Sequence, residues 1–291
     1  MRLFFAGFYE QNAYKWIDPE IMKSCCVLGS YFYLASKHKR KDFDPTLPRD
    51  FLLDCGAFSF VFGSNTAGAS RGINWKEYVR NYADFVKEFK IQKYLEIDID
   101  AIVGYDRVVY YRNMLEDLVG WPCIPVYHVG RTDEQFVESC QGRPYVCYGT
   151  NIGEAAKNNP NVARIANMAH EQGCRIHLLG VSDPMPLKET GIIVDSCDST
   201  SWLLGCTYGR RLNWKPGDTK MTNYNIARTE QLSPTWREKA YSLSAWRKCA
   251  KWMAQNVDII WPEDVNYPHV SEDDMTEEEL LEKYKTVPRR D

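Results

Sequence analysis

The sequence lacks the short motifs that mark several common kinds of functional site. Its ten cysteines are scattered, and no two of them form the C-x2-C pair on which most structural zinc sites are built. The chain also has no P-loop motif and no G-x-G-x-x-G turn, the usual fingerprints for binding nucleoside triphosphates and dinucleotides. These absences argue against a zinc knuckle and against NTP or NAD chemistry.

Long apolar runs are absent as well. No segment approaches the length of a membrane span, and the run Met1–Gly7 is too brief for the apolar core of a signal peptide. We therefore expect a cytoplasmic protein with reduced thiols and no membrane contact. Several cysteines stand in or beside apolar runs, where a thiol behaves as a small buried hydrophobe. They are Cys55, Cys123, Cys147, Cys174 and Cys197.

A large excess of one charge is also missing. The formal net charge is −3, so any contact with nucleic acid has to come from local basic patches. With 44% hydrophobic residues in 291, the chain has enough apolar material for a full core, in one large domain or two small ones.

Short apolar runs alternate with helical patterns along most of the chain, which is typical of parallel βαβ units. The expected strands are 3–6, 27–34, 51–54, 94–98, 123–127, 145–148, 175–180 and 192–195. The expected helices between them include 75–89, 107–118, 134–140 and 162–172. Eight strands followed by helices predict an α/β fold of the (β/α)8 TIM-barrel type, with a doubly wound open sheet as the alternative.

The pattern changes after Trp202. Residues 209–215 are basic and aromatic, and a turn follows at 216–218. We expect a barrel domain over residues 1–215 and a C-terminal helical extension over 216–291 that packs on the barrel.

The extension contains its own helix signals. A long helix is expected from Pro234 to Asn256, after the cap Ser233. An acidic tail starts at about residue 271, with the capping-box pair Thr276 and Glu279. This tail either packs through a small apolar face or stays solvated.

Polar side chains stand where several expected strands end. They are Asp54, Asp98, His128 and the pair Asp195 and Asp198. One aspartate after a strand often only caps the next helix, but several such groups on one barrel face predict a functional site. Clustered carboxylates suit reactions through a cationic sugar, in which one is the nucleophile and another the acid or base. Strand register favours Asp195 as the last residue of its strand.

Glycines follow two of the expected strands. Gly149 and Thr150 come after the strand at 145–148, and Gly180 ends the strand at 175–180. A glycine at this position lets a flat ligand approach the backbone, although it also makes an ordinary strand-to-helix turn. His128 and His177 can equally be satisfied core histidines.

Five segments together resemble the tRNA-guanine transglycosylase superfamily, over about residues 51–209. They are 53–59, 126–130, 148–153, 177–181 and 198–202. The first is similar to the family's D-S-G-G-F-Q motif, and the last to the D-S-A-S-Y motif of its archaeal branch. The resemblance implies exchange of a base through a covalent glycosyl-enzyme.

The resemblance also implies a role for each matching residue. Asp198 matches the nucleophile, so we prefer it to Asp195, which becomes its supporting neighbour at the substrate. Asp54 matches the catalytic aspartate that handles protons of the base. The other residues implied to bind substrate are Asp98, His128, Gly149, Thr150, Gly180, Phe58 and Ser59.

Departures from the family pattern point to one branch. The C-x-C-x2-C zinc site is missing, Ala57 and Ser59 replace a glycine and a glutamine of the first motif, and the chain is short for an added RNA-binding domain. These features are most similar to the phage-type 7-deazaguanine DNA transglycosylases. The resemblance then implies that guanine in DNA is replaced by a 7-deazaguanine, such as the 7-cyano form, without a metal or another cofactor.

The implied partners are DNA and a free 7-deazaguanine base, with tRNA as the alternative polymer, in a monomer or a homodimer. Arg210, Arg211 and Lys215 are candidates for binding phosphates, although such charge runs are often only solvated surface. Two other functions stay open. One is a tRNA-directed transglycosylase without zinc, and the other is a catalytically silent, nucleic-acid-binding barrel subunit.

Overall fold

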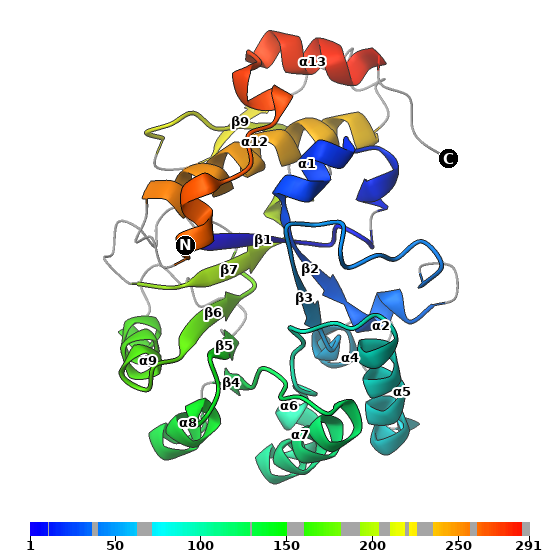
Figure 1. Ribbon diagram of the computed structural model, residues 1–291, viewed down its shortest axis with the longest axis vertical. Coiled ribbons are helices and arrows are strands. Elements are labelled where there is room, and N and C mark those ends of the chain that lie inside the picture. The colour runs from blue at the N-terminus through cyan, green and yellow to red at the C-terminus, as the bar shows by residue number, and fades with distance from the viewer. Residues whose placement is uncertain are drawn as a thin grey trace.

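A computed structural model describes residues 1–10, 12–36, 40–62, 72–128, 130–149, 160–181, 193–203, 210–218, 221–225, 235–256 and 261–286. Within these ranges strands and helices alternate, as an α/β protein requires (Figure 1). The strands are β1 (Arg2–Ala6), β2 (Cys26–Ser30), β3 (Asp50–Asp54), β4 (Val126–His128), β5 (Tyr145–Gly149), β6 (Arg175–Leu179), β7 (Ser196–Ser199), β8 (Arg210–Asn213) and β9 (Thr222–Asn225). The α-helices are α1 (Pro19–Ser24), α2 (Tyr31–Leu34), α4 (Ala57–Phe62), α5 (Trp75–Glu88), α6 (Asp100–Val103), α7 (Tyr105–Val119), α8 (Asp133–Cys140), α9 (Pro160–Glu171), α12 (Thr235–Asn256) and α13 (Glu277–Thr286). Short 3-10 helices are η1 (Ala13–Lys15), η4 (Pro262–Asn266) and η5 (Ser271–Asp274).

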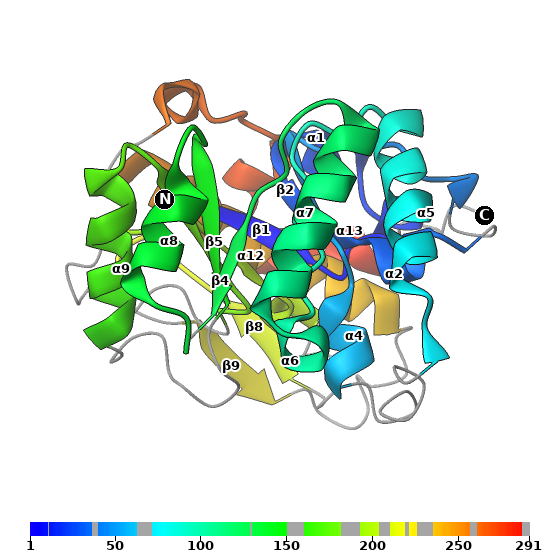
Figure 2. The ribbon, with the colours of Figure 1, turned by 90° about the horizontal axis from the view of Figure 1, so that it is seen from below.

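Strands β1 to β7 form one parallel sheet in the order β3-β2-β1-β7-β6-β5-β4, and β8 and β9 form a separate antiparallel hairpin. The sheet is curled, and helices α5, α7, α8 and α9 follow one another around its outer side (Figure 1 and Figure 2). Because the seven strands are parallel, their carboxyl ends lie along one edge, where α/β proteins build their sites.

The segment between α5 and α6 hydrogen bonds to the outer strand β3 on one side and to Ile124, before the outer strand β4, on the other side. The amide of Leu95 donates to the carbonyl of Leu53 in β3 over 2.8 Å. The amide of Ile124, just before β4, donates to the carbonyl of Tyr94 over the same distance. The strand expected over 94–98 is thus a short bridged segment, and the sheet has seven regular strands where the sequence predicts eight.

Alternation of side chains along the strands divides the core into two clusters. The larger cluster lies between sheet and helices and contains, for example, Phe5, Val27 and Leu53. The smaller cluster takes the alternate residues, on the inner side of the curled sheet. It consists of Phe4, Ala6, Cys26, Leu28, Leu52, Leu95, Ile124, Val126, Tyr145, Cys147 and Trp261. Because both faces are buried, the strands appear in the sequence as nearly continuous apolar runs.

Three expected strands have the wrong limits. The strand expected over 123–127 is β4, which begins only at Val126. The run 27–34 is a strand only as far as Ser30, after which the chain turns directly into α2. The last strand begins at Ser196 and not at 192, since Ser196 is the residue that pairs with Arg2 of β1. Asp195 precedes this strand, where its carbonyl accepts from the Arg2 amide over 2.9 Å. Residue 192 itself lies outside the described ranges.

The expected helices are confirmed as α5, α7, α8 and α9, and local caps explain where two of them begin. The Asn74 side chain accepts from the Glu77 amide at the start of α5. Thr132 and Gln135 form a reciprocal capping box at the start of α8. The long helix expected to end at Asn256 is confirmed as α12, but its expected cap at 233 lies outside the described residues.

The C-terminal segment packs on the rest of the chain. Helix α12 lies against β1, β8 and α13. The capping box of Thr276 and Glu279 is confirmed, with amide-to-side-chain hydrogen bonds of 2.8 and 3.2 Å. Leu280 and Tyr284 of α13 are buried, so this part of the acidic tail is packed and not solvated. The division into 1–215 and 216–291 stays a prediction.

Trp261 covers the amino end of the sheet. The guanidinium of Arg175 lies 3.7 Å from its ring centroid, and that of Arg2 lies 4.0 Å from it. Arg2 also forms an ion pair of 2.9 Å with the buried Asp264 of η4. This end is therefore a packed floor, and the opposite, carboxyl edge is the one that can hold a site.

Nine cysteines in the described ranges are free and buried, including the five that the sequence places in the core. Among the described helices, none combines the length and the apolar character needed to cross a bilayer.

Candidate active site

Three predicted site residues lie on inward positions at the carboxyl edge of the sheet. Asp54 ends β3 and His128 ends β4, each two residues beyond an inward apolar side chain of the same strand. Asp198 of β7 is in register with the inward Phe4 of β1. These residues, far apart in the sequence, therefore lie along one edge of the curled sheet, as the sequence predicts. We call this carboxyl edge the mouth.

The carboxylate of Asp198 is anchored through one of its oxygens. Its Oδ1 accepts from the amide of Gly180 over 2.8 Å and lies 3.3 Å from Nε2 of His177. No donor among the described residues reaches Oδ2. One oxygen is thus held in place while the other stays available for reaction, which suits a nucleophilic carboxylate.

A buried chain of hydrogen bonds holds the His177 ring on the side away from Asp198. Nδ1 of His177 lies 2.7 Å from the Ser196 hydroxyl, which is also hydrogen bonded to the hydroxyl of Tyr145. One set of donors satisfies every member of this chain: Tyr145 donates to Ser196, Ser196 donates to Nδ1, and Nε2–H donates to Asp198. His177 is a satisfied core histidine that also orients Asp198.

Asp54 has an unusual protonation state for a carboxyl group. Its Oδ2 accepts from the Gly56 amide over 2.9 Å, which favours the charged form. Burial has the larger effect, and together with the charges of Asp98 and Asp198 it raises the pKa of Asp54 to about 7. Near neutral pH this group can both donate and accept a proton, as an acid–base catalyst must.

Asp98 and His128 form a second pair at the mouth. Nε2 of His128 is hydrogen bonded to Oδ1 of Asp98. Burial alone favours the neutral ring, but the hydrogen bond and the charge of Asp98 outweigh it and raise the pKa of His128. This pair offers hydrogen-bond donors and acceptors side by side, as the edge of a purine requires.

Gly149 makes room for the His128 ring. The two residues are opposite each other in the pairing of β4 and β5. A Cβ atom on Gly149 would lie 2.3 Å from Cε1 of His128, closer than two nonbonded carbon atoms can approach. The sequence predicts that Gly149 lets a ligand approach the backbone; in the structure it is the imidazole that takes this space.

Asp98, Asp100 and His128 are also the described residues that could together hold a metal ion, since their ligand atoms lie within 4.8 Å of one another. Arg131, however, donates to Oδ2 of Asp100 over 2.9 Å, and His128 is bonded to Asp98. These carboxylates therefore already have hydrogen-bonding partners within the protein, and the arrangement suits proton transfer and hydrogen bonding.

Sequence reasoning missed two residues at this mouth. Ser30 ends β2 in register with Asp54, and its amide donates to Oε1 of Glu10 over 2.8 Å. Glu10 follows the carboxyl end of β1, which is the signal that could have identified it. The sequence gives no sign that a strand ends at Ser30, because residues 27–34 look like one uninterrupted strand.

Asp195 does not support Asp198, and that prediction is wrong. Its Oδ2 accepts from the amide of Ile176 over 2.7 Å and lies 2.8 Å from Nε2 of His170. Its carbonyl accepts from the indole of Trp261 at the amino end of the sheet. Three residues of extended chain, about 10 Å, separate the two aspartates, so Asp195 is structural and lies at the opposite edge.

The remaining predicted residues are only partly described. Ser59 lies in α4, where its hydroxyl donates to that of Tyr33 over 3.5 Å. Thr150 and the side chains of Phe58, Arg210 and Arg211 lie outside the described part of the structure. Lys215 is exposed and lies beside a pocket that none of the carboxylates at the mouth lines.

No protein-family model matches this chain, and no curated protein sequence matches it. Its function therefore has to be argued from the carboxylates and histidines at the mouth.

Proposed function

We propose that this protein is a base-exchange transglycosylase that replaces guanine in DNA with a 7-deazaguanine through a covalent aspartyl-glycosyl intermediate. The observation that carries the proposal is the presence of two unlike carboxyl groups at the same edge of the sheet. Asp198 has one oxygen anchored by two donors, and Asp54 has a pKa of about 7. Retaining glycosyl transfer needs a nucleophile and a separate acid–base group in this way.

The proposed scaffold is a (β/α)8 barrel with a C-terminal helical extension. The bridged segment at 94–95 would act as the missing strand, since it hydrogen bonds to β3 on one side and to the residue before β4 on the other side. β7 pairs with β1, so the ring would then be closed. Asp54, Asp98, His128 and Asp198 would all line its mouth.

In the first step Oδ2 of Asp198 attacks C1′ of the target nucleotide. The bond from C1′ to guanine breaks, and protonated Asp54 gives its proton to the departing base. In the second step Asp54 takes the proton from the incoming 7-deazaguanine. The base nitrogen then attacks C1′ from the vacated face, and Asp198 leaves as a carboxylate. Two inversions restore the original configuration.

Asp98 and His128 would recognise the base through hydrogen bonds to its edge. The carboxylate of Asp98 accepts from N–H groups on the guanine edge, which adenine does not present in the same pattern. The imidazole of His128, with its raised pKa, is a donor to a base carbonyl. Since C1′ is enclosed in a duplex, the target nucleotide has to be flipped out or single-stranded.

The decisive experiment traps the covalent intermediate. Wild-type protein is incubated with guanine-containing DNA, or with tRNA as the alternative polymer, and denatured adducts are separated by mass. We expect an adduct with DNA that maps to Asp198, and release of guanine when 7-cyano-7-deazaguanine is added. Asp198→Asn should form no adduct, whereas folded Asp195→Asn should still form it.

Each other outcome is informative. An adduct with tRNA alone would assign the RNA-directed alternative. Binding of nucleic acid with neither an adduct nor guanine exchange would indicate a silent binding subunit. An adduct that survives in Asp198→Asn would reject Asp198 as the nucleophile.

A further inference from the structure

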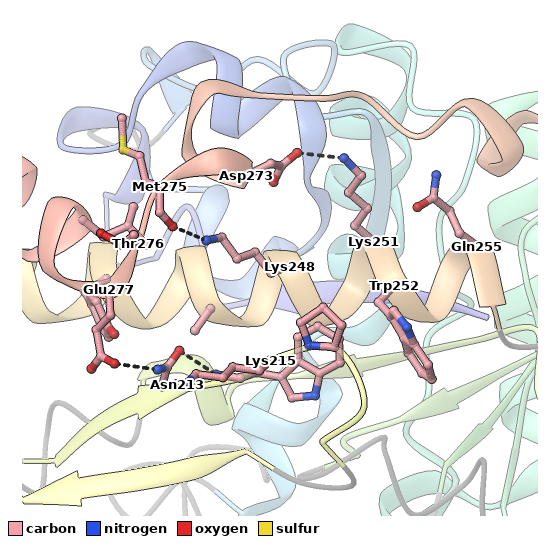
Figure 3. Close-up of a pocket in the computed structure, with 15 residues that line it drawn as sticks. Asn213, Lys215, Lys248, Lys251, Trp252, Gln255, Asp273, Met275, Thr276 and Glu277 are labelled. Atoms are coloured by element: carbon pink, nitrogen blue, oxygen red, sulfur yellow. Dashed lines mark hydrogen bonds and ion pairs between the residues drawn. The ribbon is translucent and has the colours of Figure 1, made fainter.

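A pocket lies away from the mouth, between the end of β8, helix α12 and the segment from Asp273 to Leu280 (Figure 3). Its volume is about 410 Å³, within the range of about 300–1,000 Å³ that is typical of small-ligand sites. Tyr241, Ala245 and Lys248, followed by Trp252, lie three or four residues apart on α12 and so share one face of this helix. We call this the α12 pocket.

One wall of the α12 pocket is aromatic. The rings of Trp214, just after β8, and Trp252 have centroids 5.7 Å apart and are tilted by 55°. Trp214 is buried, and its indole donates to the carbonyl of Asp218, whereas Trp252 is only partly buried. Figure 3 shows Trp252 on the opposite side of α12 from Asp273. A partly exposed indole backed by a fixed one offers a flat surface on which a base can stack.

The polar part of the pocket has a surplus of positive charge. Lys215, Lys248 and Lys251 line it, against the carboxylates of Asp273 and Glu277. Lys251 is 2.8 Å from Asp273, which is also paired with the buried Arg247. Asp273 thus has two cationic partners, and the side chains that line the pocket carry one more positive than negative charge, which favours a further anion.

Lys248 is one lysine of the pocket that such an anion would stabilise. It is partly buried, and its Nζ donates to the carbonyl of Met275 over 3.1 Å. Burial, followed by the charge of Arg247, lowers the pKa of Lys248. A phosphate near this ammonium would relieve that penalty.

We propose that the α12 pocket binds one nucleotide of the DNA strand at a distance from the reacting guanine. The base stacks on Trp252, and its phosphate is held by Lys215 and Lys248. This inference rests on the proposed function, because it names the same polymer as partner.

The test uses a thymidine-only single strand, which contains no guanine and so does not depend on base exchange. Binding to a labelled oligonucleotide is measured by fluorescence anisotropy at several salt concentrations. Lys215→Gln and Lys248→Gln should each reduce the slope of log K against log salt by about 0.7. Trp252→Leu should weaken binding about 5- to 100-fold. The matched control Lys76→Gln, on an exposed position of α5, should change neither quantity.

Lys215 is exposed, so its variant tests the proposal without disturbing the core. The proposal is overturned if the oligonucleotide does not bind, or if the three pocket variants bind it with the wild-type affinity and salt slope. Guanine exchange combined with unchanged oligonucleotide binding would reject this pocket and keep the proposed function. If the pocket variants weaken oligonucleotide binding but no guanine is exchanged, the pocket is supported and the proposed function is rejected.

Discussion

The imidazole of His177 is wholly buried, and its Nε2 lies 3.3 Å from Oδ1 of Asp198. The other nitrogen of the same ring, Nδ1, is hydrogen bonded to Ser196 deeper in the sheet. The carboxylate at the mouth is thus connected to the inner core of the sheet through a single side chain. Displacement of this ring would leave Oδ1 of Asp198 held, among the described residues, only by the Gly180 amide.

His177 should therefore affect the rate of the reaction more than the binding of the base. In His177→Phe, Asp198 keeps only the Gly180 amide as a donor. Losing a hydrogen bond to a charged group costs about 1.5–3 kcal/mol, or about 10- to 160-fold in kcat. His177→Gln, which keeps an N–H donor, should recover part of the rate.

Single-turnover kinetics with calorimetric binding of the free base measures both quantities. His170→Gln is the matched control, because His170 forms a similar pair with Asp195 at the other edge, 2.8 Å apart. Its kcat should equal that of the wild type. A purely structural role for His177 would instead appear as equal losses in stability and base binding, with kcat of the folded fraction unchanged.

Asp54 should make the free energy of unfolding fall between about pH 4 and pH 7. Its pKa rises from 3.8 to about 7 on folding, mainly because of burial, so the folded state binds the proton more tightly. The resulting stabilisation is complete below the unfolded pKa and is lost as the pH rises through the folded pKa. The difference amounts to at most about 4 kcal/mol.

Asp54→Asn removes this titration. Urea unfolding at pH 4 and pH 7.5 should show that the variant gains stability relative to the wild type at the higher pH. An identical pH dependence of the two proteins would mean that Asp54 has an ordinary pKa, and its proposed acid–base role would lose its support.

Gly149→Ala should displace His128 from Asp98. The added methyl group would lie 2.3 Å from the ring, so either the ring or the strand has to move. Overpacking of this kind costs about 1–3 kcal/mol of stability. Binding of the free base, measured by calorimetry, should weaken as well, because the hydrogen-bonded pair of His128 and Asp98, which we propose recognises the base, is broken.

Gly72→Ala is the control for this substitution, since a Cβ at Gly72 meets no atom within 4 Å. This variant should match the wild type in thermal unfolding and base binding. If Gly149→Ala behaved in the same way, the contact between Gly149 and His128 would have no role in holding the pair.

Much of the local structure could be predicted from the sequence because its causes are local. Helix α8 begins where Thr132 and Gln135 can cap each other, and α13 begins after Thr276 for the same reason. The parallel strands are apolar along their length because both faces are buried. Asp54 and His128 were found at strand ends by this pattern alone.

The resemblance favours Asp198 over Asp195, but the places of the two residues in the fold depended on the tertiary structure. The apolar run alone favoured Asp195 as the last residue of its strand, but pairing of Ser196 with Arg2 moves the strand along the chain and places Asp195 at the floor. A shift of this kind is decided by hydrogen bonds to a strand almost two hundred residues away, which no local pattern contains.

The sequence by itself was sufficient for the βα alternation, the helix starts and the presence of carboxylates where strands end, since these follow from periodicity and from capping. Only the tertiary structure could decide which carboxylates meet, that His177 supports Asp198, and that Asp54 has a pKa of about 7. Burial and charge at one atom are sums over neighbours from distant segments, and those neighbours are known only once the chain has folded.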